Sequence, residues 1–187
     1  MPAASRWRTK RVALKEFEDS DAGFYLELCA SLAVGRTFRF GGMSISPPAR
    51  TSAVWDGVLC HLVAVGVDSR RRLGVISLTS ADLRNATVYL SAISDQDVLG
   101  SGLMVEAVAL GLHYAFETWP WRKVYLEVPA YNFDAFGSGL DRFFVSEGTL
   151  RDHVYLDGRY WDVHVLAITR DRWTAHGLPF LRRLQPA

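Results

Sequence analysis

The chain has 187 residues, with 21 Lys and Arg against 20 Asp and Glu, so its formal net charge is +1. The hydrophobic fraction of 49% and the charged fraction of 22% are typical of a folded globular protein and argue against intrinsic disorder. The near-zero net charge gives no global field for a polyanion, so we expect no nucleic-acid partner. The length favours a single domain over residues 1–187.

Cysteine content and hydropathy indicate the compartment. Only Cys29 and Cys60 are present, too few and too far apart for a zinc ribbon or a disulfide framework. The five histidines show no metal-ligand spacing, so we expect no metal. The most apolar stretches reach about half of the roughly 20 residues that a membrane-spanning helix needs. The sequence therefore predicts a cytoplasmic protein without a membrane partner.

The first half of the chain reads as strands with two helices near its start. Cap residues at 19–21 predict a helix to about residue 31, and the prolines at 47 and 48 precede a second short helix that ends near residue 58. The arginine-rich stretch 68–72 is interpreted as a solvated hairpin turn. Strands are expected at 11–17, 60–67, 73–79 and 87–94.

The second half begins with a strongly apolar helix over residues 102–118, followed by a strand at 123–128. A strand, a helix and another strand predict a crossover between parallel strands. Pro129 cannot donate to a ladder, so pairing on at least one side of that strand is expected to stop there. A glycine-interrupted helix should follow at 132–143. The last unit is a hairpin, 151–156 and 159–168, around Asp157-Gly158.

A short glycine loop is the first candidate for chemistry. Leu99, Gly100, Ser101, Gly102 and Leu103 lie between an expected strand and the start of the apolar helix. Glycines let the backbone approach a ligand closely, and the free N–H groups of a helix start attract anions. The pattern predicts a phosphate site, although turns into helices also use glycine for geometry alone.

Several segments in this order resemble the GNAT superfamily of acyl-CoA-dependent N-acetyltransferases, in particular its RimJ/RimL-like branch. The glycine loop continues into Val105-Glu106-Ala107, as in the family's pyrophosphate loop and helix, and Asn132 matches the asparagine that opens the next helix. Residues 144–151 and 157–162 resemble the branch's C-terminal signature. The resemblance implies an α/β fold: a single domain with a mixed, splayed β-sheet of about seven strands flanked by helices.

The resemblance also implies a function and a set of site residues. The function is acetyl-CoA-dependent N-acetylation of a primary amine by direct transfer, with acetyl-CoA as co-substrate and no metal. Its pantetheine would lie between strands 87–94 and 123–128. The implied cofactor residues are Ile93, Leu99, Gly100, Ser101, Gly102, Leu103 and Asn132. The candidates for catalysis are Glu127 as a base and Tyr131 or Ser138 near the thiol; Phe38, Arg39 and Phe40 would wall the acceptor site.

Two positions depart from the family pattern and keep alternatives open. Asp97 stands where the loop usually begins with Arg or Gln, and Ala135 stands where the next helix usually carries a serine. A non-catalytic acyl-CoA-binding or regulatory module, or a transferase for another acyl-CoA, is therefore a second interpretation. The acceptor can be a protein N-terminus or a small-molecule amine, and a homodimer is compatible with the sequence.

Overall fold

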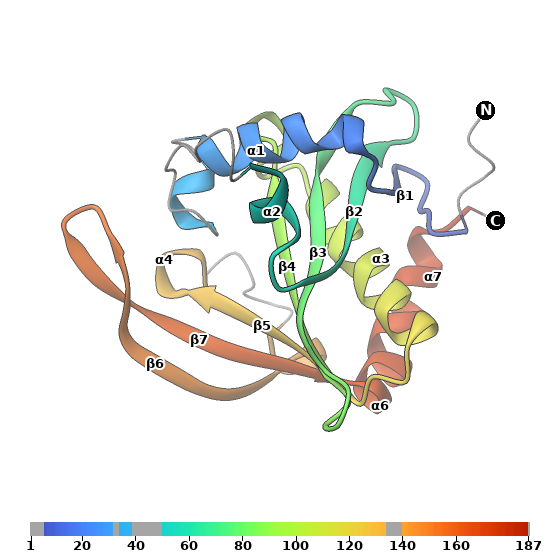
Figure 1. The fold of residues 1–187 in the computed structure, drawn as a ribbon. Helices are drawn as coiled ribbons and strands as arrows, with labels where there is room; N and C mark the ends of the chain where they lie inside the picture. Colours follow the sequence, from blue (N-terminus) through green and yellow to red (C-terminus); the bar gives the residue numbers. More distant parts are fainter. Residues whose placement is uncertain (1–5, 32–33, 39–49, 134–139, 187) are drawn as a thin grey trace.

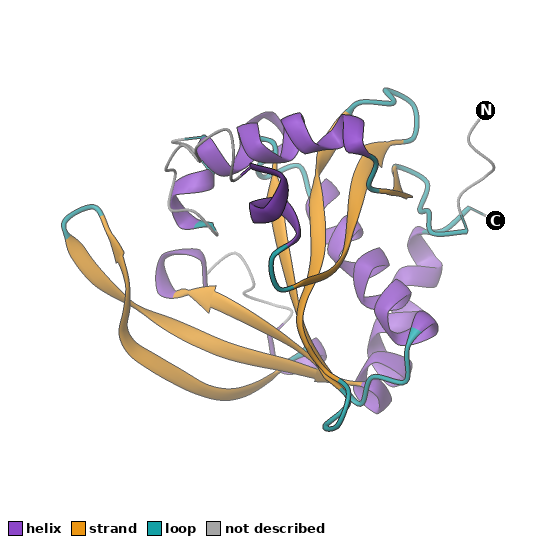
Figure 2. Ribbon diagram, in the orientation of Figure 1, coloured by secondary structure: helices purple, strands orange, loops and turns teal. Residues whose placement is uncertain are grey.

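A seven-stranded mixed sheet in the order β1-β2-β3-β4-β5-β7-β6 runs through the protein (Figures 1 and 2). The computed structural model describes residues 6–31, 34–38, 50–133 and 140–186. All neighbouring strands are antiparallel except β4 and β5, which are parallel. The strands are β1 (Val12–Glu16), β2 (Val58–Gly66), β3 (Arg72–Asp82), β4 (Thr87–Ser94), β5 (Lys123–Pro129), β6 (Val145–Leu156) and β7 (Arg159–Thr169).

Helices cover both faces of the first four strands (Figure 2). On one face lie α1 (Ala22–Ala30), preceded by η1 (Asp19–Asp21), and α2 (Arg50–Trp55). On the other lie α3 (Leu103–Thr118) and the C-terminal segment α6 (Arg170–Arg172), η6 (Trp173–Gly177) and α7 (Leu178–Leu184). The short elements η2 (Gly35–Thr37), η4 (Gln96–Val98), α4 (Ala130–Phe133) and α5 (Leu140–Phe143) complete the described chain.

Each face of the sheet has its own buried core. The larger core joins the inner sides of the strands to α3 and includes Ile76, Leu90, Leu110 and Trp121. The smaller core lies under α1 and α2, where Tyr25 and Val54 pack against Val75 and Ile93. Alternation along β3 and β4 sends successive side chains to these two cores, which is why both strands are apolar on both faces.

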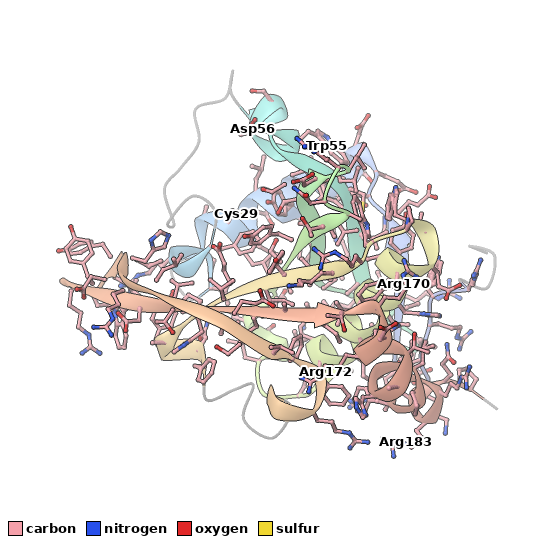
Figure 3. The ribbon with its side chains drawn as sticks, turned by 90° about the horizontal axis from the view of Figure 1, so that it is seen from below. Cys29, Trp55, Asp56, Arg170, Arg172 and Arg183 are labelled. Atoms are coloured by element: carbon pink, nitrogen blue, oxygen red, sulfur yellow. The ribbon has the colours of Figure 1, made fainter. Side chains whose placement is uncertain are left out.

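Arg170 joins α3 to the strands that follow it. Its guanidinium donates to the carbonyl oxygens of Phe116 (2.8 Å), Trp119 (2.7 Å) and Trp121 (3.0 Å). The carbonyls at a helix end lack partners within the helix, so a cation there satisfies them and complements the helix dipole. Figure 3 shows Arg170 at the junction of α3, β5 and β7.

Most expected elements are confirmed. The strand at 87–94 has the predicted bounds, and the Asp157-Gly158 turn adopts positive φ at both residues (53° and 80°), as a tight hairpin requires. The helix expected at 132–143 is present as α4 and α5, and residues 134–139 between them lie outside the described part. The C-terminal helices were not expected. Across the described ranges, no helix is long and apolar enough to cross a membrane.

His113 lies on α3 among aromatic rings rather than in solvent. Its ring packs edge-on against Trp7 (centroids 5.2 Å apart) and is tilted against Trp173 (6.3 Å). Burial lowers the pKa of His113, because the charged imidazolium loses hydration there; Glu117 opposes this shift. The folded protein therefore holds a neutral histidine at this position.

Acid should destabilise the fold through His113. Its folded pKa lies below the unfolded value of 6.5, so the unfolded chain binds more protons between the two values. The contribution of the neutral His113 to the stability of the fold is complete above pH 6.5 and is lost as the pH falls toward the folded pKa. We expect the free energy of unfolding, measured with urea, to differ less between about pH 7.5 and about pH 5.5 in His113→Phe than in the wild type. His153→Phe, at an exposed position on β6, is the control and should keep the wild-type difference.

Candidate functional site

The two central strands separate shortly after they pair. The parallel strands β4 and β5 are in register at Thr87↔Lys123, Val88↔Val124 and Tyr89↔Tyr125, and not beyond. The rings of Tyr89 and Tyr125 stack at the last pair, with centroids 5.2 Å apart. Residues 90–94 and 126–129 then face each other across a gap, so their facing backbone groups are open to a ligand.

The prediction that pairing on at least one side of β5 stops at Pro129 is confirmed on the β7 side, but the pairing of β5 with β4 ends earlier. β5 leaves β4 after Tyr125, four residues before the proline, yet stays paired with β7 as far as Pro129↔Val163. The cause lies in the β6–β7 hairpin, which carries β5 away from β4 (Figure 1). Pro129 marks the end of the β5–β7 ladder instead.

The glycine loop lies where β4 ends and α3 begins. Gly100 and Gly102 have positive φ (73° and 76°), a region that side chains other than glycine rarely adopt. The hydroxyl of Ser101 donates to the carbonyl of Val98 (2.6 Å) and accepts from the N–H of Leu103 (3.2 Å). Among the described residues, the N–H groups of Gly100 and Gly102 have no hydrogen-bond acceptor, so they are available to an anion.

A guanidinium stands beside this loop, held by a buried carboxylate. Glu106 in the first turn of α3 is 4% exposed and accepts from Arg11 Nε (2.7 Å) and from the Thr9 hydroxyl (2.5 Å). Another nitrogen of Arg11 lies 3.6 Å from where a Cβ on Gly102 would be. The ion pair therefore places a positive charge, itself half-exposed, at the start of α3.

Asp97 does not stand alone at the loop. Arg71, from the turn between β2 and β3, binds the carboxylates of Asp97 (2.7 Å) and Asp95 (3.0 Å). The N–H of Asp97, with the Arg71 guanidinium, lowers the pKa of Asp95. The arginine-rich turn is thus more than a solvated turn, because one of its residues neutralises acidic charge at the loop.

A cavity of about 840 Å³ opens at the gap between β4 and β5 on the side of α1 and α2. Arg36 and Asp157 form an ion pair across its rim, joining η2 to the β6–β7 turn. Three carboxylates and one guanidinium are among the described lining residues. The polar and charged lining residues are Arg36, Asp56, Ser77, Thr79, Ser80, Ser91, Ser94, Glu127, Asn132 and Asp157.

The structure brings most of the expected site residues to this cavity. Its lining includes Phe38, Ile93, Leu99, Glu127, Tyr131 and Asn132. Glu127 is exposed, and Lys123 on the same strand binds Glu147 (2.8 Å). Burial, followed by the Glu127 carboxylate, raises the pKa of Tyr89, so the carboxylate lies within electrostatic reach of that phenol. Arg39, Phe40 and Ser138 lie outside the described residues.

Sequence reasoning missed several cavity residues because they come from elements judged to be structural. Tyr25 lies on α1 and Asp56 follows α2, where Figure 3 shows it at the end of that helix. Ser77 is buried within β3. A serine inside an apolar strand was the available signal, since a buried hydroxyl needs a hydrogen-bond partner.

The arrangement is similar to the fold of solved N-acetyltransferases. No family model and no curated protein sequence matches the chain, so the comparison rests on solved structures. The TM-score is 0.74 with a chimera of the spermidine N-acetyltransferase SpeG from Vibrio cholerae and hSSAT, which is 20% identical and covers 87% of this chain and 98% of that one. At this identity the match establishes the fold.

Two further structures of the Vibrio cholerae protein agree. The spermidine/spermine N-acetyltransferase SpeG in complex with manganese ions has a TM-score of 0.73, is 20% identical and covers 88% of this chain and 96% of that one. The spermidine N-acetyltransferase in complex with CoA and spermine has a TM-score of 0.71, is also 20% identical and covers 87% and 98%. The expected mixed sheet of about seven strands is confirmed.

The Arg11–Glu106 pair should stabilise the start of α3. Replacing Glu106 by Gln removes a buried charge-assisted interaction, which contributes about 1.5–3 kcal/mol when a charged group is involved. We expect a loss of about that size in the free energy of unfolding, measured by urea denaturation. Glu117→Gln on the same helix breaks only an exposed pair with Arg6 (3.4 Å) and should cost less than about 1 kcal/mol. Equal losses in the two variants would contradict the assignment.

Proposed function

We propose that the protein is an acetyl-CoA-dependent N-acetyltransferase that transfers the acetyl group directly to a primary amine of a small molecule. The observation that carries this proposal is the gap between β4 and β5, which joins a glycine loop at the start of α3 to a cavity on the α1 side. A thin, linear thioester can lie in such a gap and present its acyl group to an acceptor in the cavity. The solved structures of the same fold include a CoA complex.

The cofactor residues follow from the geometry of the gap. We place the pyrophosphate on the N–H groups of Gly100 and Gly102, with Ser101 bracing the loop and Arg11 adding positive charge. Leu99 and Leu103 flank these groups in the chain. The pantetheine arm would run along the free edge of β4 to Ile93, with Asn132 on the opposite wall.

The acceptor site favours a cation. Asp56, Glu127 and Asp157 line the cavity, and Arg36, which pairs with Asp157, is the one guanidinium among the described lining residues. A small diamine or polyamine fits this charge, because one ammonium group can stay with the carboxylates while another nitrogen reacts. Phe38 supplies an apolar wall against Tyr25, with ring centroids 6.5 Å apart. The neighbours of the same fold are spermidine and spermine acetyltransferases.

The chemistry needs a neutral amine and a protonated leaving group. The amine nitrogen attacks the thioester carbon, the C–N bond forms, and the C–S bond breaks to release a thiolate. We assign Tyr131 as the donor to that thiolate, because it lies on α4 directly after β5 and lines the cavity. Glu127 orients the cationic acceptor. No covalent acyl-enzyme is part of this mechanism.

Three further expectations belong to this proposal. The RimJ/RimL-like branch is supported by the sequence of residues 144–162 alone. Cytoplasmic location is supported by Cys29 and Cys60, which form no disulfide. A homodimer is supported by β6, an edge strand of 12 residues that is exposed over most of its length and carries the exposed ring of Tyr155.

The proposal predicts both binding and turnover. Calorimetric titration with acetyl-CoA should give a micromolar dissociation constant, or about −8 kcal/mol. Steady release of free CoA thiol should follow when spermidine is added, at a kcat/KM about tenfold or more above that of a monoamine with an uncharged tail. Binding without release for any amine or peptide N-terminus would favour the non-catalytic module instead. Faster release with peptide N-termini would overturn the small-molecule acceptor.

The loop glycines should be needed for cofactor binding rather than for folding. Gly100→Ala places a Cβ at positive φ, which costs roughly 1–2 kcal/mol and shifts the N–H groups that face the phosphates. We expect weaker acetyl-CoA affinity by about tenfold in titration. Gly158→Ala is the matched control, since this glycine also has positive φ and open space around it, but lies in the β6–β7 turn. Equal affinity in both variants would refute the assignment of the loop.

A further inference from the structure

A histidine and a serine are hydrogen-bonded at the base of the cavity. His61 on β2 and Ser77 on β3 are cross-strand neighbours, 3% and 2% exposed. Their Nδ1 and Oγ atoms are 2.7 Å apart, and His61 Nε2 lies 2.9 Å from the carbonyl oxygen of Val54 near the end of α2. Ser77 also lines the cavity, so the pair connects the buried histidine to the proposed acceptor site.

The partners of His61 define its proton positions. A backbone carbonyl can only accept, so Nε2 carries the hydrogen and donates it to Val54. In the neutral ring Nδ1 is then a lone pair that accepts the hydroxyl hydrogen of Ser77. The lone pairs of Ser77 Oγ stay available to another donor. A hydroxyl, a histidine and an orienting group in this order are the arrangement that activates a hydroxyl as a proton carrier.

The polar row continues toward the gap between β4 and β5. Ser91 on β4 is the cross-strand neighbour of Ser77, and it lies two residues before Ile93, where the thioester is placed. Side chains directly opposite each other on antiparallel strands are about 4.5–5.5 Å apart at Cβ, close enough for hydroxyls or one water to connect them. Ser91 also lines the cavity.

Aromatic rings hold the imidazole of His61 in place. The rings of Tyr25, Phe17 and Trp55 surround it, with centroids 4.8, 5.0 and 5.0 Å away. A buried imidazole loses hydration when it is charged, so the ring starts in the neutral form, which can accept a proton from Ser77.

We propose that Ser77 and His61 form a proton relay that deprotonates the acceptor amine during acetyl transfer; the inference rests on the proposed acetyltransferase function. As the C–N bond forms, the nitrogen passes one proton to Ser77 Oγ while Ser77 passes its hydroxyl proton to His61 Nδ1. The thioester C–S bond breaks, and the thiolate takes a proton from Tyr131. The imidazolium and the tyrosinate are then reset by proton exchange with solvent. Ser77 touches the substrate, and His61 acts through it.

The relay gives the reaction a pH dependence with a defined sign. His61 must be neutral to accept a proton, so kcat should rise with pH and then level off. Among the described titratable groups, Tyr25 packs against His61, Cys29 lies in the same core cluster as Tyr25, and Asp56 and Glu127 line the same cavity as Ser77. The variants therefore have to distinguish the effect of His61 on the pH dependence of kcat from the effect of Glu127.

The test compares pH profiles of CoA release with acetyl-CoA and spermidine. His61→Asn keeps an acceptor for Ser77 but cannot take a proton. We expect kcat to fall by about 10²-fold or more, KM to change by less than about threefold, and the rising limb to move to higher pH. Ser77→Ala should behave alike and Ser77→Thr should restore most of the rate. Glu127→Gln should raise KM for spermidine and leave the rising limb of the kcat–pH profile unchanged.

Controls keep the outcomes separate. His153→Asn, at an exposed position on β6, should match the wild type. Acetyl-CoA affinity and thermal midpoint are measured for every variant, and Ser77→Ala, which removes only one hydroxyl, decides the question if His61→Asn does not fold. If His61→Asn or Ser77→Ala leaves the rising limb of the kcat–pH profile unchanged, the relay is wrong and the proposed function stands. The same conclusion follows if Glu127→Gln removes that limb. A wild type that binds acetyl-CoA but acetylates no amine would overturn the proposed function and the relay with it.

Discussion

The separation of β4 from β5 is the constraint on which the rest of the site depends. Two parallel strands that pair at only three positions leave backbone N–H and C=O groups without partners, and such groups are costly when they are buried. The protein keeps them open to the cavity instead of covering them. The gap is stable because each strand is held on its other edge, β4 by β3 and β5 by β7 as far as Pro129. A ligand with its own donors and acceptors can complete both edges.

The helix between these strands is fixed at both ends, and this positions the loop. At its start, buried Glu106 binds Arg11 and Thr9 from the segment that leads into β1. At its end, Arg170 collects carbonyls from the last turn of α3 and from the segment that follows. With both ends anchored to the sheet, the N–H groups at the start of α3 keep their direction. A phosphate bound by these N–H groups, as we propose, would need this rigidity, because backbone donors cannot adjust to a ligand as a side chain can.

Local patterns predicted the elements well, and long-range packing decided the rest. The strand at 87–94 and the Asp157-Gly158 turn follow from alternation and turn chemistry, so sequence was sufficient there. Pro129 ends the pairing of β5 with β7 as predicted, whereas the point where β4 and β5 part follows from the course of the β6–β7 hairpin, which no local pattern encodes. The hydrogen bond of Ser77 joins residues 16 positions apart, and spacing alone does not show it. The resemblance located Glu127 and Tyr131 near the cavity, because they lie on or directly after β5.

The chain is nearly neutral, yet its charge is divided between the two sides of the gap. On the loop side, Glu106 pairs with Arg11, and Asp95 and Asp97 share Arg71, so the attraction for an anion comes from the backbone N–H groups at the start of α3 and from the half-exposed Arg11 guanidinium beside them. On the cavity side, carboxylates outnumber the guanidinium among the described lining residues. The carboxylates of the cavity would therefore attract a cationic acceptor and repel an anionic cofactor, which is left to the backbone N–H groups at the start of α3. Net charge conceals this division, since a sum near zero is as compatible with two opposed fields as with none. The position of charges along the gap, rather than their total, then determines which two substrates can meet there.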